Sequence, residues 1–180
     1  SKNQIPWIQF WADSYDFKIT KEKNYNLIKF ADSHIFLSYY AYKNSPFKKN
    51  YYFEGGIRIK SSKMRLNSNS QIKLLYSGSF LIWGGVDDLI DTFTKLTLSN
   101  VELNLCGHGK IKKETLKKIK NDKRINFHGS LTRESLDQLL SETDIFLNPR
   151  PEIYGNHMNF PSKILEYLSY SKPILSTKTP

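Results

Sequence analysis

The sequence is poor in the residues that build disulfide scaffolds and zinc centres. Its 180 residues include one cysteine, Cys106, and four histidines. A single cysteine cannot form an internal disulfide bond, and no Cys or His spacing in the chain resembles a zinc site. Cys106 ends an apolar run, which is typical of a buried structural thiol rather than of a nucleophile. The sequence therefore points to neither a disulfide scaffold nor a zinc protein.

Long hydrophobic runs are also missing. No apolar stretch approaches the roughly 20 residues that cross a bilayer, and Ser1 to Gln4 do not open a signal peptide. Hydrophobic residues make up 39% of the chain and aromatic residues 14%, which is enough to build a core. We therefore expect a globular protein in the cytoplasm.

Acidic residues are fewer than basic ones, 17 against 27, and the net charge is +10. The excess is concentrated before residue 71, and a second basic cluster lies between Lys110 and Arg124. Such surfaces can contact anionic lipid head groups or nucleic acid, or can simply be solvated. A peripheral position on an anionic membrane surface stays open. Nucleic acid is the least favoured partner, because the chain has no nucleic-acid motif.

Residues 61–71 are polar and almost free of apolar periodicity, which is typical of a linker. This linker would separate a first segment, 1–60, from a domain at 72–180. The expected elements of the first segment are strands at 7–11 and 34–38 with a helix at 21–30 between them. They indicate a partial α/β unit. Because neither end of the chain has a closing element, we expect a piece of a longer protein, truncated at its end.

After the linker, strand-like and helix-like patterns alternate. Short apolar runs predict five strands, at 72–76, 101–106, 124–128, 144–148 and 173–176. Helical spacing predicts helices between them, at 86–96, 110–120, 136–140 and 161–170. This alternation predicts a Rossmann-like parallel sheet with helices on both faces. In such sheets the ligand binds at the carboxyl ends of the strands.

The most informative stretch is residues 159–167. Pro161 suits the first position of a helix, where its missing N–H costs nothing. The amides of Ser162, Lys163 and Ile164 would then face outward at the positive end of the helix dipole. Such a helix start favours an anion, for example a pyrophosphate, and Lys163 would add a full positive charge.

Glu166 follows one turn later and would accept hydrogen bonds from a ribose diol on the same face of the helix. Ile164, Leu165 and Leu168 would form the opposite, buried face. The ordinary alternative for Glu166 is a solvated surface glutamate. Its place at the ligand edge of the predicted sheet favours the binding role.

Five segments, in order, resemble the family-4-like retaining glycosyltransferases of the GT-B fold. The similar segments are Tyr76 to Gly78 with Gly85 to Ile90, Leu105 to Gly109, Ile125 to Leu131, Asp144 to Pro149, and Phe160 to Tyr167 with Lys172 to Ile174. Ala31 to Ile35 and Gly55 to Ile57 also resemble the end of the family's acceptor domain and its interdomain stretch.

The resemblance implies two facing Rossmann-like domains, with a nucleotide-sugar such as a UDP- or GDP-sugar bound to the second. It implies hexosyl transfer to a polysaccharide or glycolipid acceptor, with retention at the anomeric carbon and without a metal ion or cofactor. A helix start with a lysine can stabilise the charge of a leaving diphosphate. The catalytic groups that face the acceptor would lie largely in the first domain, so the chain itself gives no catalytic residue.

Carried over by position, Glu166 would hold the ribose hydroxyls, and Ser162 and Lys163 would hold the diphosphate. The backbone at Leu131 would contact the edge of the base. Gly78 would let the chain approach the phosphates closely.

Arg150 lies just past the fourth strand and is a second phosphate candidate. His108, between two glycines, is a candidate for the donor cleft, and the alternative is a structural role in the turn. The chain departs from the family at three positions. Ser79 stands where an arginine is common, Gly84 where a lysine is common, and Met158 where a second glutamate is common. Ser79 remains a candidate contact because it follows the first strand's glycine.

Other functions stay open beside sugar transfer. The missing cations are compatible with a non-catalytic module that binds a nucleotide-sugar. A basic nucleic-acid-binding domain would instead bind with a steep salt dependence. A nucleotide-sugar epimerase on the same fold is a third alternative.

Overall fold

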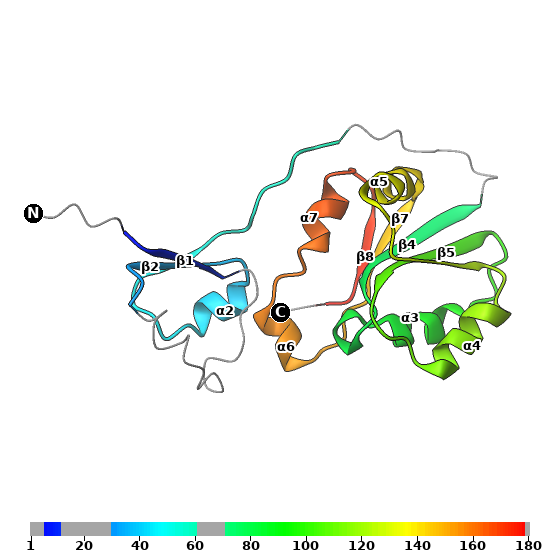
Figure 1. Ribbon diagram of the computed structural model, residues 1–180, viewed down its shortest axis with the longest axis horizontal. Helices are drawn as coiled ribbons and strands as arrows, with labels where there is room; N and C mark the ends of the chain where they lie inside the picture. The colour runs from blue at the N-terminus through cyan, green and yellow to red at the C-terminus, as the bar shows by residue number, and fades with distance from the viewer. Residues whose placement is uncertain (1–5, 12–29, 61–70, 179–180) are drawn as a thin grey trace, which may run out of the picture. The chain divides into compact units, whose positions relative to one another are not determined.

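The computed structural model in Figure 1 describes residues 6–11, 30–60 and 71–178. These residues fall into two compact units. The first holds the described residues up to Gly56 together with Glu152–Pro161, and the second holds Ile57–Pro151 and Ser162–Lys178. The expected linker at 61–71 and the expected helix at 21–30 lie almost wholly outside the described residues.

The first unit contains a small parallel sheet. Its strands, in the order β1-β2-β3, are β1 (Ile8–Trp11), β2 (Ser33–Phe36) and β3 (Asn50–Tyr52), and its helices are α2 (Tyr39–Lys43) and α6 (Tyr154–Met158). Ser38 Oγ donates a 2.8 Å hydrogen bond to the carbonyl of His157. Met158 is buried in one core with Phe36 and Ala41. These contacts explain why residues 152–161, expected in the second domain, group with the first unit.

The second unit is built on a five-stranded sheet in the order β6-β5-β4-β7-β8, and every pair is parallel. Its strands are β4 (Ile72–Ser79), β5 (Val101–His108), β6 (Ile125–Gly129), β7 (Ile145–Asn148) and β8 (Ile174–Ser176). Its helices are α3 (Val86–Phe93), α4 (Lys113–Asn121), α5 (Arg133–Glu142) and α7 (Lys163–Leu168), with a 3-10 turn, η1 (Ile82–Gly84). The predicted Rossmann-like α/β fold is confirmed.

Helices cover both faces of this sheet, as Figure 1 shows. Ile90 of α3 and Ile119 of α4 are buried in one hydrophobic core. Leu140 of α5 and Tyr167 of α7 are buried in the other. Successive residues of a strand point to opposite faces, so each central strand supplies side chains to both cores. This explains why these strands read as continuous apolar runs.

Helix α7 begins later than expected. Its first residue is Lys163, and Ser162 is the N-cap, with helical backbone angles and no side-chain cap. Pro161 is therefore not the first helical residue. The carbonyl of Ser162 accepts a hydrogen bond from the amide of Leu165 (3.1 Å), so the first turn of helix α7 starts at Ser162.

The buried face of α7 also differs from the prediction. Leu168 is 43% exposed, and Ile164 and Leu165 are only half-buried. Tyr167 and Tyr170 are buried instead. An aromatic ring buries more apolar area than a leucine side chain, so the two tyrosines decide which face of the short helix meets the sheet.

Gly107 allows β4 and β5 to approach closely at their carboxyl ends. It lies opposite Gly78 in the register of the two strands and has a φ of 142°, which L side chains rarely adopt. A Cβ at this position would lie 1.8 Å from the carbonyl oxygen of Gly78. A side chain therefore cannot be added without moving a strand.

We predict that Gly107→Ala destabilises the protein by more than about 2 kcal/mol, because backbone strain and a clash with a rigid strand add together. Gly129→Ala is the matched control. Gly129 also has a positive φ, 63°, but nothing lies within 4 Å of the Cβ that the substitution would add. It should cost only about 1 kcal/mol of strain. Urea unfolding of both variants measures the difference, and equal losses would contradict the close approach.

Candidate functional site

The candidate site lies where the order of the strands reverses. From β4 the chain continues to β5 and β6 on one side of the sheet, and to β7 and β8 on the other. The ladder between β4 and β7 pairs only Leu74 and Leu75 with Ile145 and Phe146. The end of β4 beyond Leu75 is thus free of β7, and a crevice outside the carboxyl ends of two such strands is where doubly wound sheets bind ligands.

Tyr167 of α7 takes the place of a strand partner at the end of β4. Its hydroxyl accepts a hydrogen bond from the amide of Ser77 (2.9 Å) and donates one to the carbonyl of Ser77 (3.2 Å). Its ring stacks on Phe146, with centroids 4.4 Å apart and an interplanar angle of 4°. Burial raises the pKa of the Tyr167 phenol, so the group stays a neutral donor and acceptor.

A charged cluster lies beside this contact. Lys163 Nζ lies 3.5 Å from Ser77 Oγ and 3.2 Å from Glu166 Oε2. Arg133, at the start of α5, donates from Nη1 to Glu166 Oε1 (2.9 Å). The Glu166 side chain is only 18% exposed, and each of its oxygens meets one cation. Glu166 is therefore not a solvated surface glutamate.

The backbone at the start of α7 matches the expected anion site in one respect. Among the described residues, the amides of Ser162, Lys163 and Ile164 have no hydrogen-bond acceptor. Ser162 is exposed, and the other two residues are half-buried. These donors stand next to the charge of Lys163.

Cys106 lies close to this cluster. It is buried toward the carboxyl end of β5, beside the side chain of Ser77. Burial raises the pKa of the thiol, although the contact with Ser77 and the charge of Lys163 act in the opposite direction. The prediction that Cys106 is buried is confirmed, and a buried thiol with a raised pKa is a poor nucleophile.

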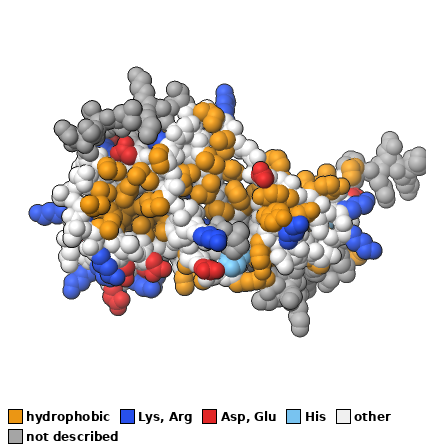
Figure 2. Space-filling model, turned by 180° about the vertical axis from the view of Figure 1, so that it is seen from behind, with side chains coloured by type: hydrophobic (Ala, Val, Ile, Leu, Met, Phe, Trp, Pro, Cys, Tyr) orange, Lys and Arg blue, Asp and Glu red, His pale blue; other side chains and the backbone are white. Residues whose placement is uncertain are grey.

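The loop after β4 has no room for the lysine that is common in the family. A Cβ at Gly84 would lie 2.1 Å from the carbonyl oxygen of Ser79 and 2.2 Å from the hydroxyl of Tyr76. That hydroxyl donates a 2.6 Å hydrogen bond to the same carbonyl, which closes the loop on itself. The loop presents apolar side chains instead: Leu81, Ile82 and Trp83 are 49%, 72% and 50% exposed. Figure 2 shows hydrophobic side chains gathered on the face of the protein that it presents.

The remaining candidate residues lie around the same edge. Ser79 and His108 are opposite each other in the register of β4 and β5, and His108 is exposed. Arg150 follows β7, and its charge acts on the Tyr76 phenol, whose pKa burial raises. Leu131 is half-buried against the core under α5 and borders a depression of about 170 Å³.

Arg133 is the residue that the sequence interpretation missed. Its sequence signal is its spacing of four residues from Asp137 on a helix, which favours an ion pair. Its guanidinium donates to Asp137 from Nη2 (2.9 Å) and from Nε (3.3 Å) as well as to Glu166. The pairing with Glu166, 33 positions away, has no signal in the sequence.

Asp137 extends the cluster to the segment before β4. Its Oδ1 accepts hydrogen bonds from Lys60 Nζ (3.0 Å) and from the Tyr170 hydroxyl (2.8 Å). The Tyr170 bond, followed by the Lys60 bond, lowers the pKa of the Asp137 carboxyl to about 2. The amide of Lys60 also donates to the carbonyl of Ser169 (2.7 Å), just after α7.

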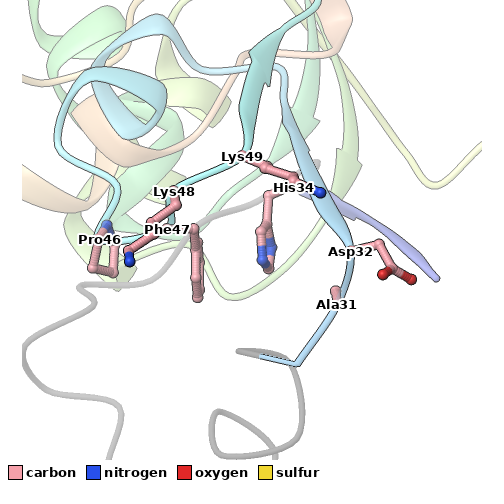
Figure 3. Close-up of a pocket in the computed structure, with 7 residues that line it drawn as sticks. All are labelled: Ala31, Asp32, His34, Pro46, Phe47, Lys48 and Lys49. Atoms are coloured by element: carbon pink, nitrogen blue, oxygen red, sulfur yellow. The ribbon is translucent and has the colours of Figure 1, made fainter. Parts of the chain in front are cut away.

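The first unit has a cavity of its own, of about 510 Å³, shown in Figure 3. The rings of His34 and Phe47 lie face to face at its wall, 3.7 Å apart, and Lys48 and Lys49 follow on the chain. His34 Nδ1 accepts a hydrogen bond from Trp11 Nε1 (3.2 Å), and burial lowers the pKa of the imidazole. His34 is thus a packing residue with a hydrogen-bond partner. The cavity lies at the amino ends of β2 and β3, opposite to the edge where parallel sheets bind ligands.

The sheet order and the helices on both faces define a Rossmann-like α/β unit of the kind found in GT-B glycosyltransferases. The chain belongs to the family Glycosyl transferases group 1, whose model matches residues 71–180. The resemblance seen in the sequence is confirmed. No curated protein sequence matches the chain.

Three solved structures are similar in fold. They are the lipopolysaccharide outer core galactosyltransferase WaaB in its apo form (TM-score 0.63, 20% identity), HepE of Anabaena in complex with UDP and glucose (0.68, 20%) and TarM (0.70, 12%). The matches cover 88%, 97% and 96% of this chain, but only 46%, 53% and 36% of those chains. The chain thus spans about half their length or less.

The described residues hold neither a candidate membrane span nor a candidate metal cluster. No helix in them is long and apolar enough to cross a membrane. Nor do the same ranges contain a group of three or more His, Cys, Asp and Glu side chains that could hold a metal ion.

We predict that Tyr170→Phe raises the pKa of Asp137 from about 2 toward its ordinary value of 3.8, because the largest cause of the shift is lost. A depressed folded-state pKa contributes stability that is complete above pH 4 and is lost as the pH falls toward 2. The variant should therefore lose less stability over this window. NMR titration of the side-chain carboxyl carbons measures the pKa, and an unchanged value would contradict the hydrogen bond.

Proposed function

We propose that the chain is the donor-binding part of a glycosyltransferase that transfers a sugar from a nucleotide-sugar to a glycan or lipid-linked acceptor, with retention and without a metal ion. Membership of the family supports sugar transfer in general. One observation carries the proposal for this chain: Lys163 and Glu166 lie together on α7 at the switch point of the sheet.

The two residues suit the two polar parts of a nucleotide diphosphate. A carboxylate accepts hydrogen bonds from both hydroxyls of a ribose, and Glu166 is partly shielded from water, which strengthens such bonds. A leaving diphosphate develops negative charge. Lys163 and the unpaired amides at the start of α7 would stabilise that charge without a cation. Arg150, after β7, would supply a second positive charge.

The acceptor side rests on weaker support. Residues 1–70 carry most of the excess positive charge, which suits an acceptor held at an anionic membrane surface. Vesicles with and without anionic lipid test this part separately, and equal binding to both would contradict it.

We predict that Glu166→Ala weakens the binding of UDP or GDP by about 1 to 3 kcal/mol, because charged hydrogen bonds to the ribose are lost. Isothermal titration calorimetry measures the affinity. Glu114→Ala removes an exposed carboxylate from α4 and serves as the control, since α4 packs on the face of the sheet opposite to α7. If both variants bind like the native chain, Glu166 does not hold the ribose.

Lys163→Met tests the diphosphate contact. We expect a loss of about tenfold in affinity for the nucleoside diphosphate, and a much smaller loss for the nucleoside, since only the former carries the charge that Lys163 meets. Lys117→Met, on the exposed face of α4, controls for the change in net charge. Equal losses for both ligands would place Lys163 away from the phosphates.

A binding module without catalysis is the second candidate. The observation that favours it is the closed loop after β4. This loop leaves no room for a side chain at position 84, and residue 79 is a serine instead of a basic residue. A full-length protein that binds a nucleotide-sugar, yet releases no nucleotide diphosphate in the presence of any acceptor, would favour this function over transfer.

A further inference from the structure

We propose that Arg133 is a positioning residue for the ribose-binding carboxylate of Glu166, and that Asp137 and Lys60 hold Arg133 in place. This inference rests on the proposed function, because it assigns Glu166 to the ribose. Arg133 would not contact the donor itself. It would fix the plane in which Glu166 offers its oxygens to the diol.

The contacts of Glu166 favour such a role. Arg133 Nη1 occupies one position on Oε1 at 2.9 Å, and Lys163 Nζ occupies one on Oε2 at 3.2 Å. Each carboxylate oxygen has two lone-pair positions, so one on each oxygen remains for a hydroxyl donor. With both ends held, the carboxylate cannot rotate freely. A bound diol then meets an acceptor pair that is already oriented, which lowers the entropy lost on binding.

Arg133 is itself fixed by a second carboxylate. Its Nη2 and Nε donate to the two oxygens of Asp137, at 2.9 and 3.3 Å, while Nη1 reaches Glu166. The guanidinium is a rigid plane with five donors, so two carboxylates on different edges set its orientation completely. A lysine has one flexible ammonium group and would not hold both partners in a fixed geometry.

Lys60 and Tyr170 complete the network behind Asp137. Both donate to Asp137 Oδ1, at 3.0 and 2.8 Å, and Lys60 Nζ also lies 4.7 Å from the centre of the Tyr170 ring. The path of contacts from Lys60 through Asp137 and Arg133 to Glu166 is continuous. It ties the segment before β4 to the start of α5 and to α7.

Stability alone does not account for this arrangement. The Arg133 side chain is 57% exposed and that of Asp137 40%, and ion pairs with such exposure contribute at most about 1 kcal/mol each. Glu166, at 18%, is the least exposed member of the chain of contacts from Lys60 to Glu166. The more exposed residues Lys60, Asp137 and Arg133 thus form a series of contacts that ends at the shielded carboxylate of Glu166. This is the arrangement expected of groups that orient that carboxylate.

Discrimination between ribose and 2′-deoxyribose tests the proposal. The native chain and its Arg133→Ala variant are titrated with UDP and GDP and with their 2′-deoxy forms. We expect the variant to lose about tenfold of the preference for the ribose form, while its affinity for the 2′-deoxy form changes little. Arg133→Lys, which keeps the charge but not the fork, should lose part of the preference. Asp137→Asn should do the same, because it loosens Arg133.

Two controls separate a positioning role from a general loss of fold or charge. Lys117→Ala removes one exposed cation from α4 and should keep the native preference. Thermal unfolding checks that the Arg133 variants fold, and Arg133→Gln replaces Arg133→Ala if the latter does not.

The outcomes distinguish this inference from the proposed function. If Glu166→Ala loses the preference for ribose and Arg133→Ala keeps it, the positioning role is wrong and the ribose contact stands. If Arg133→Ala weakens both forms equally, Arg133 contributes only charge and the inference is again wrong. If the native chain binds no nucleotide, or prefers neither sugar, the assignment of Glu166 fails and the inference fails with it.

Discussion

The phenol of Tyr167 satisfies both backbone groups of Ser77 at the point where β4 and β7 separate. A strand that loses its neighbour leaves an amide and a carbonyl without partners, and burying them unpaired would cost about 1 to 3 kcal/mol each. Tyr167 meets this requirement from a helix. The same contact places Lys163 and Glu166, which precede it on α7, beside the end of β4. The candidate site therefore depends on this one side chain more than on any charged residue.

The closed loop after β4 shows how the chain can differ from its family and still keep a polar edge. The Tyr76 hydroxyl occupies the space that a side chain at position 84 would need, so a lysine there would require a different loop conformation. Cations near the candidate site stand on other elements instead: Arg133 on α5, Lys163 on α7 and Arg150 after β7. Since electrostatic stabilisation depends on where a charge lies and not on which element carries it, the missing lysine does not by itself remove the function.

Most of the fold was predictable from the sequence, because the strands of a parallel sheet read as short apolar runs and the helices as periodic ones. The orientation of α7 was not. The apolar residues Ile164, Leu165 and Leu168 predicted a buried face, yet the rings of Tyr167 and Tyr170 took that place. Tyrosine is ambiguous in a sequence, because its ring favours burial only when its hydroxyl finds a partner, and the partner of Tyr167 is a backbone 90 positions away.

The candidate site was predictable only in part for the same reason. Lys163 and Glu166 are neighbours on one helix, so spacing alone brought them together. Arg133 lies far from Lys163 and Glu166 in the sequence and meets Glu166 only in the folded chain. Local sequence spacing indicates only its pairing with Asp137, four residues away. The grouping of residues 152–161 with the first unit is likewise decided by distant contacts, those of Met158 with Phe36 and Ala41.

The charges of the cluster suggest how phosphate and ribose binding would be coupled. Arg133, Lys163 and Lys60 face only two carboxylates, Glu166 and Asp137, so one positive charge is in excess. Lys163 is the cation that can turn toward a diphosphate at least cost, because Arg133 still pairs with Glu166 when Lys163 leaves. Arg133 would then be the cation that keeps Glu166 oriented, and both oxygens of Glu166 keep a lone pair for a ribose hydroxyl. The diphosphate and the ribose are thus coupled through Lys163, because its move to the phosphate leaves the orientation of Glu166 to Arg133.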